Sequence, residues 1–189
     1  MKVVVIIDMQ NDFITGSLGS HDAQLAKKNI LEELKKEKYK GSAVIFTKDT
    51  HKNDYLDTFE GKRLPVPHCI EGTEGWCIDA DIASAVICSD FISVNDDFYG
   101  IENSRVYKPT FGSLHLNGWI GWLNSENSID EITFMGVCTD ICVVSNVLLA
   151  RAHCPNIPIN VVADCCAGTT PENHDAALSV MKSCQIDII

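Results

Sequence analysis

Residues 2–8 read KVVVIID, a run of aliphatic side chains that begins after one lysine and stops at an acid. Unbroken β-branched runs of this length are typical of strands buried on both faces, as in a parallel sheet. Three later runs have the same character, at residues 43–46, 132–135 and 159–163. We therefore expect a parallel sheet built around the first strand.

Stretches with helical periodicity separate these strands. They cover residues 23–34, 143–152 and 172–184, and each places its apolar side chains on one helical face. Strands that alternate with helices predict an α/β fold with helices on both faces of the sheet, a three-layer αβα arrangement. Two weaker strand patterns, at 91–94 and 104–107, would bring the mostly parallel central sheet to about six strands.

The length of the chain indicates how many domains it forms, and its net charge argues against two classes of binding partner. The chain has 189 residues, of which 46% are hydrophobic, enough for the core of a single domain over residues 1–189. A net charge of -11 repels phosphate backbones and anionic lipid surfaces, so we expect neither a nucleic-acid partner nor a membrane partner. A small neutral substrate is not excluded by this charge. No apolar stretch reaches the ~20 residues that a membrane-spanning helix needs.

Cysteine usage indicates the compartment. The chain has nine cysteines, an odd number, and lacks a Cys-x-x-Cys pair. A chain of this size does not need disulfides for stability, so we expect reduced thiols and a cytoplasmic location. Most of these thiols are expected to be small buried hydrophobic side chains.

Polar residues follow the ends of the predicted strands, where α/β sheets bind ligands. Asp8 ends the first strand and Lys108 follows the strand at 104–107. Taken alone, Asp8 is an ordinary turn residue and Lys108 an ordinary surface charge. At one sheet edge, however, the carboxylate can accept a proton and the ammonium can stabilise a thiolate or an oxyanion.

The segment GVCTDICV at 136–143 is the candidate nucleophile turn, because it leads from a strand into a helix. Cys142 is expected at the start of that helix, where free N–H groups and the helix dipole favour a thiolate and could hold an oxyanion. Cys138 lies on the tighter part of the bend, where a structural role is expected. Because Asp8 and Lys108 are predicted at the same sheet edge, we interpret Cys142 as the nucleophile.

A metal site is predicted next to this edge. Asp49 and His51 follow the strand at 43–46, and residues two apart in an extended chain point the same way. His68 follows in a stretch stiffened by two prolines. Two imidazoles and one carboxylate suit a single divalent ion, with zinc preferred over iron or manganese, and leave coordination positions open. The alternative is a loop-capping Asp49 with two unrelated surface histidines.

The ordered motifs together resemble the isochorismatase-like cysteine hydrolases and, within that family, the nicotinamidase group. The similarity runs through most of the chain. The motifs that carry it are Asp8 with QNDF at 10–13, Lys108-Pro109 with FGS at 111–113, the GVCTDICV segment, and VADCCA at 162–167. The resemblance implies the isochorismatase-like hydrolase fold. It also implies conversion of nicotinamide to nicotinic acid and ammonia through a cysteine thioester.

The resemblance assigns a role to each catalytic candidate. It implies that Asp8 accepts the proton of Cys142, that Lys108 favours the thiolate, and that the backbone N–H groups of Cys138 and Cys142 hold the oxyanion. Phe13 and Tyr107 are the candidates for packing against the pyridine ring, with a place in the core as the alternative for each.

The resemblance also assigns the metal ligands. It implies that Asp49, His51 and His68 hold a metal ion that binds the pyridine nitrogen directly. Some family members add a carboxylate upstream of the second histidine, and Glu60 is the candidate for that ligand here.

Two other functions remain open from the sequence. One is a different hydrolase of the same family that acts on a carbamoyl or isochorismate-like substrate, and metal in the purified protein would count against it. The other is a non-catalytic, metal-stabilised binding protein, which predicts no ammonia release from any amide. Assembly into a homo-oligomer is also left open.

Overall fold

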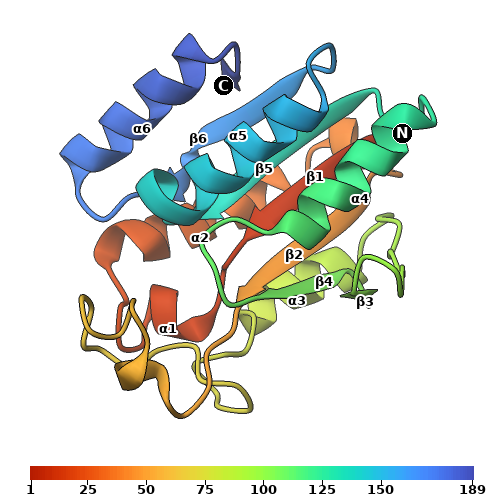
Figure 1. The fold of residues 1–189 in the computed structure, drawn as a ribbon. Coiled ribbons are helices and arrows are strands. Elements are labelled where there is room, and N and C mark those ends of the chain that lie inside the picture. The colour runs from red at the N-terminus through yellow and green to blue at the C-terminus, as the bar shows by residue number, and fades with distance from the viewer.

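A computed structural model describes all 189 residues and confirms an α/β chain (Figure 1). Short helical turns occupy Glu37–Tyr39 (η1), Tyr55–Asp57 (η2) and Thr139–Val143 (η3, a π-helical turn). The strands and helices follow one another as β1 (Lys2–Ile7), α1 (Asn11–Ile14), α2 (His21–Glu33), β2 (Ala43–Asp49), α3 (Ala80–Ile87), β3 (Ile101–Glu102), β4 (Arg105–Lys108), α4 (Leu114–Ser125), β5 (Glu131–Val137), α5 (Val144–His153), β6 (Ile159–Ala167), α6 (Pro171–Ser183) and β7 (Asp187–Ile188).

A seven-stranded sheet runs in the order β3-β4-β2-β1-β5-β6-β7. Every neighbouring pair is parallel except β3 and β4, which are antiparallel. β1 lies at the centre, where Val5 pairs with Ile45 of β2 and with Phe134 of β5. The aliphatic run at the start of the chain is therefore the middle strand, as its composition predicts.

Alternate side chains of β1 belong to two separate hydrophobic cores. Val3, Val5 and Ile7 pack in one core with residues of α4, α5 and α6, whereas Val4 and Ile6 pack in the other with residues of α2 and α3. Figure 1 shows α4 and α5 in front of the sheet, with α2 behind it. The three-layer αβα arrangement is therefore confirmed. None of its helices combines the length and the apolar character needed to cross a membrane.

Capping side chains explain where the helices start. Ser20 accepts a hydrogen bond from the N–H of the third residue of α2, and Thr170 does the same for α6, whose first residue is Pro171. Asp79 and Ser113 cap α3 and α4 in the same way. The sequence analysis missed these last two helices, although both caps were readable in the sequence.

The edges of the sheet differ from the prediction. The strand expected at 91–94 is wrong, because only Ile92 makes a bridge, to Ala43. The two-residue strands β3 and β7 complete the sheet instead, which gives seven strands rather than about six. Strands this short lack the run of apolar residues on which sequence patterns depend. All nine cysteines are free thiols, as expected.

Gly136 allows the central strands to approach each other at the carboxyl edge of the sheet. It pairs with Ile7 of β1 and with Cys166 of β6, and it has a φ of 128°. A Cβ atom at this position would collide with the backbone carbonyl oxygen of Ile7. Glycine is therefore required here both for its conformation and for its small size.

Replacing Gly136 by Ala is expected to reduce the free energy of unfolding by roughly 3 kcal/mol or more, because two central strands must separate. Gly41→Ala is the matched control: Gly41 also has a positive φ, of 72°, but nothing lies within 4 Å of the point that a Cβ atom would occupy. It should cost only about 1–2 kcal/mol, which is the backbone strain alone. Urea denaturation measures both values, and equal losses would contradict the close contact.

Candidate active site

The carboxyl ends of the central strands meet beside a cavity of about 910 Å³. The residues that line it include Phe13 of α1, Asp49 at the end of β2, His51 and His68 from the segment after β2, and Cys142 after β5. In this fold the ligand is expected at that edge. The structure therefore brings together residues from both halves of the chain.

Asp8 follows directly after β1, is fully buried and is not among the residues that line the cavity. Its φ of 49° is in the left-handed region, which aspartate tolerates better than most residues. Thr47 of β2 fixes the carboxylate: its hydroxyl donates to Asp8 Oδ1 at 2.6 Å and accepts from the Asp8 backbone N–H at 3.2 Å. The other carboxylate oxygen is thus directed to a different partner.

That partner is Lys108 at the end of β4, whose Nζ lies 2.6 Å from Asp8 Oδ2. The same ammonium lies 3.6 Å from the sulfur of Cys142 and 3.8 Å from Asp49 Oδ1. Lys108 is only 1% exposed. One buried cation therefore links the predicted base, the predicted nucleophile and a predicted metal ligand.

The charges of this group depend on one another. Burial by itself would lower the pKa of Lys108, but the carboxylates of Asp8 and Asp49 raise it above its ordinary value, so the amine stays protonated. Burial raises the pKa of Asp8, and Asp49 raises it further, against the opposing effect of Lys108. A carboxylate with a raised pKa is a better proton acceptor than an exposed one.

Opposing effects act on the thiol of Cys142. Burial raises the pKa of this thiol well above its ordinary value; Lys108 lowers it, but Asp8 and Asp49 raise it again. Cys142 also lies in the π-helical turn η3 and not in α5 itself. The net rise in the pKa agrees with the expected role of Asp8 as the base that accepts the proton of this thiol.

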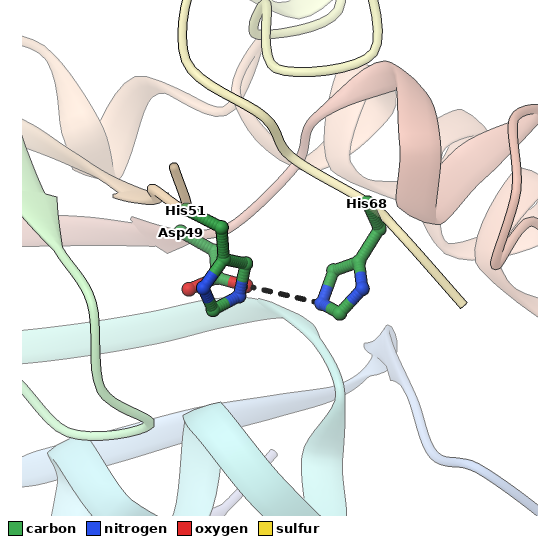
Figure 2. A group of neighbouring side chains, drawn as sticks. All are labelled: Asp49, His51 and His68. Carbon is green, nitrogen blue, oxygen red and sulfur yellow. Dashed lines mark hydrogen bonds and ion pairs between the residues drawn. The ribbon is translucent and has the colours of Figure 1, made fainter. Parts of the chain in front are cut away.

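The three predicted metal ligands form one buried group (Figure 2). His51 Nε2 lies 3.0 Å and His68 Nε2 lies 3.4 Å from Asp49 Oδ2. One ligand atom from each residue lies within 4.8 Å of the other two. Figure 2 shows the two imidazoles and the carboxylate turned toward a common point.

The donor chemistry of this group fits a divalent metal ion. His68 Nδ1 lies 2.8 Å from the carbonyl oxygen of Val66, an arrangement in which Nδ1 carries the proton and Nε2 is free to bind a metal. Nitrogen and carboxylate ligands in a set of three leave positions for a substrate. Burial raises the pKa of Asp49, but the hydrogen bonds to the two histidines hold it below its usual range. A metal ion bound to this carboxylate would offset the cost of burying its charge.

Glu60 lies at the margin of this group. Its Oε1 is 3.7 Å from His51 Nε2 and 3.8 Å from His68 Nε2. Glu60 lines the cavity, and its side chain is 22% exposed. It is therefore near the metal ligands, but farther from them than Asp49 is.

The two aromatic candidates differ in position. Phe13 lines the cavity, and its ring centroid lies 5.5 Å from that of His68. Tyr107 does not line it, because it precedes Lys108 on β4 and so faces the opposite side of the sheet. It stacks there on Trp76, at 5.6 Å between centroids. Tyr107 is therefore not retained as a ring contact.

The sequence analysis assigned no role to Gln10, which is fully buried. Gln10 Nε2 donates to the carbonyl oxygen of Asp49 at 2.9 Å, and its Oε1 accepts from the Asp49 N–H at 2.7 Å. Gln10, just after β1, thus fixes the backbone of Asp49, a predicted metal ligand on the neighbouring strand β2. Its place in the QNDF motif, two residues after Asp8, was the signal in the sequence.

His174 lies near the start of α6. Its Nδ1 forms a hydrogen bond of 2.8 Å with the hydroxyl of Thr139. Asp140 accepts from the backbone N–H of Thr169 at 2.8 Å. The start of α6 is therefore tied to the turn that carries Cys142, which sequence spacing could not reveal.

Comparison with known proteins assigns the chain to a family. A sequence model described as the isochorismatase domain matches residues 2–189. The chain belongs to the isochorismatase family. This isochorismatase-family chain is 27% identical to the nicotinamidase/pyrazinamidase of Mycobacterium tuberculosis, over 100% of this chain and 98% of that protein. It is 25% identical to the nicotinamidase of Schizosaccharomyces pombe, over 98% of this chain and 91% of that one.

Solved structures agree with this assignment. The nicotinamidase/pyrazinamidase of Bacillus subtilis has a TM-score of 0.77 to this isochorismatase-family chain, with 26% identity. The match covers 99% of this chain and 98% of the B. subtilis chain. The likeness therefore includes the whole sheet and the loops at its carboxyl edge.

His68→Ala should remove bound metal, because only one histidine and one carboxylate of the group remain. His115→Ala is the matched control, since His115 is exposed and lies outside the group. After loading with a divalent ion and gel filtration, elemental analysis should find near-stoichiometric metal in the wild type and in His115→Ala. Equal metal content in all three proteins would show that His68 is not a ligand.

Proposed function

We propose that the protein is a metal-dependent cysteine amidohydrolase that converts nicotinamide to nicotinic acid and ammonia. The observation that carries the proposal is the meeting of two buried groups at one cavity. Lys108 Nζ contacts Asp8 and lies 3.6 Å from Cys142 Sγ, and the same ammonium lies 3.8 Å from Asp49 of the metal group. The matches to nicotinamidases at 25–27% identity over nearly the whole chain support the same function.

Asp49, His51 and His68 would hold the metal ion, with Glu60 as a candidate fourth ligand. Zinc suits a set of two imidazoles and a carboxylate, and iron and manganese are the alternatives. When bound, the ion would act as a Lewis acid toward the pyridine nitrogen and would fix the orientation of the ring. The remaining steps belong to side chains and backbone groups of the protein.

Acylation begins with removal of the proton from the Cys142 thiol. Asp8 accepts its proton while the nearby Lys108 ammonium stabilises the developing negative charge on sulfur. The sulfur attacks the carboxamide carbon and forms a carbon–sulfur bond. Backbone N–H groups of Cys138 and Cys142 are the proposed donors to the oxyanion.

The tetrahedral adduct then collapses. Asp8 gives its proton to the amide nitrogen, the carbon–nitrogen bond breaks, and ammonia leaves a thioester on Cys142. Asp8 next takes a proton from water, which attacks the thioester carbon. The carbon–sulfur bond breaks, the proton returns to sulfur, and nicotinic acid is released.

The position of Phe13 suits the ring of the substrate. Phe13 is 8% exposed, lines the cavity and lies beside His68. A flat pyridine ring held near His68 would contact this side chain, and aromatic contacts of this kind contribute about 0.5–1.5 kcal/mol beyond the buried area. The proposal therefore retains Phe13 as a substrate contact.

The free thiols suit a reducing cellular compartment. All nine cysteines are unpaired in the structure. We propose that the enzyme acts in a reducing cytoplasm, where thiols persist.

Ammonia release tests the proposed function. The metal-loaded protein should release ammonia from nicotinamide and only slowly from benzamide, which has the same carboxamide and ring size without the ring nitrogen. Loss of orientation alone can reduce a rate by about 100-fold or more. Equal rates with the two amides would contradict a role for the ring nitrogen, and no ammonia from nicotinamide would contradict the proposed function.

Cys142→Ala should abolish hydrolysis and leave the metal content unchanged, because the sulfur is the attacking atom and is not among the metal ligands. Cys138→Ala is the matched control, since Cys138 also lines the cavity and its proposed contribution is its backbone N–H. It should keep its turnover number within about threefold, because no side-chain contact to the reacting atoms is lost. Turnover that survives in Cys142→Ala would contradict the assignment of the nucleophile.

A further inference from the structure

Asn146 on α5 has a fully buried side-chain amide with four hydrogen bonds. Its Oδ1 accepts from the backbone N–H of Ser113 at 2.9 Å and from Asn117 Nδ2 at 3.3 Å. Its Nδ2 donates to the carbonyl oxygens of Phe111 at 3.1 Å and Cys142 at 2.8 Å. A primary amide has two N–H donors and two acceptor lone pairs, so every bonding position of Asn146 is used.

These bonds join two segments of the proposed active site that are far apart in the sequence. Residues 109–113 follow directly after Lys108, and Asn146 holds their backbone at Phe111 and Ser113. The same side chain holds the backbone of Cys142. Asn146 therefore connects the chain just beyond the lysine to the residue that carries the nucleophilic sulfur.

The packing around this connection is tight. Gly112 lies against α5, and a Cβ on it would come within 2.9 Å of Leu149 Cδ1 and 3.4 Å of Ser145 Cβ. The loop after Lys108 is thus packed against α5 at Ser145 and Leu149, which precede and follow Asn146 on that helix. A small shift of either backbone would change the distance between the ammonium and the sulfur.

We propose that Asn146 is a positioning residue that sets the Lys108 Nζ to Cys142 Sγ distance of 3.6 Å. The inference rests on the proposed roles of Lys108 and Cys142. Burial makes the interaction between ammonium and thiolate strong and sensitive to distance. A misplacement of about 1 Å can reduce a rate by about 100-fold, and it acts on the reaction more than on substrate binding.

Asn146→Leu removes all four bonds and keeps the number and branching of the side-chain heavy atoms. Asn117→Leu is the matched control, because Asn117 is also a fully buried amide and bonds to Ser113 O and Asn146 Oδ1, but it contacts neither Phe111 O nor Cys142 O. Both variants should lower the melting temperature. Only Asn146→Leu should lower kcat, by about tenfold or more with KM changed by less than about threefold, since the reaction and not binding is affected.

A second variant covers the case in which Asn146→Leu does not fold. In Asn146→Ser the hydroxyl can donate to the carbonyl four residues earlier, Cys142 O, as Ser145 does to Ile141 O at 2.6 Å. The serine cannot reach the loop at 111–113, so the connection is broken and kcat should fall again with KM nearly preserved. A wild-type kcat in Asn146→Ser, or an equal loss in Asn117→Leu, would overturn the inference.

The structural readout does not depend on the substrate. Crystal structures of the wild type and of Asn146→Ser should show a longer distance between Lys108 Nζ and Cys142 Sγ in the variant. An unchanged distance would overturn the positioning role. If the wild type released no ammonia from nicotinamide, the proposed function would fail, and this distance would still decide the role of Asn146.

Discussion

The buried ion pair between Asp8 and Lys108 is the interaction on which the proposed active site depends. Both side chains are almost completely removed from solvent, and their charged atoms lie 2.6 Å apart. An isolated buried charge costs several kcal/mol, so each ion requires the other. Thr47 donates a hydrogen bond to one carboxylate oxygen of Asp8, and the ammonium of Lys108 contacts the other. The same ammonium lies beside the sulfur of Cys142. The proton of the thiol can therefore pass to Asp8, the carboxylate that pairs with the same ammonium.

Asp49 couples this ion pair to the metal group. One of its oxygens lies 3.8 Å from Lys108 Nζ, and the other lies 3.0 Å and 3.4 Å from the two histidines. Gln10 fixes its backbone on both sides. The residue that would hold the metal ion and the residue that would stabilise the thiolate are thus adjacent on neighbouring strands. A ring held at the proposed metal would therefore lie near the sulfur that is proposed to attack its carboxamide.

The sheet explains why such a site forms at this edge. Parallel strands end together, so β1, β2, β4 and β5 deliver Asp8, Asp49, Lys108 and the Cys142 turn to one place. Gly136 lets β5 approach the end of β1 without a clash, which keeps the nucleophile turn close to Asp8. Stability and chemistry therefore depend on the same strand contacts.

The sequence by itself determined the parallel α/β fold and most of the site. Apolar runs such as 3–7 indicate burial on both faces of the sheet. Such runs precede Asp8, Cys142, Asp49, His51 and His68, whereas Lys108 follows the weaker pattern at 104–107. Only the tertiary structure decided the burial that raises the pKa of Cys142, the exclusion of Tyr107 from the cavity, and the bonds of Asn146. The pKa of a group depends on its burial and on the charges around it. Whether a strand residue lines the cavity depends on the face of the sheet that it occupies, and a buried amide needs bonding partners from other segments of the chain. None of these is a property of neighbouring residues in the chain, so no local pattern could carry them.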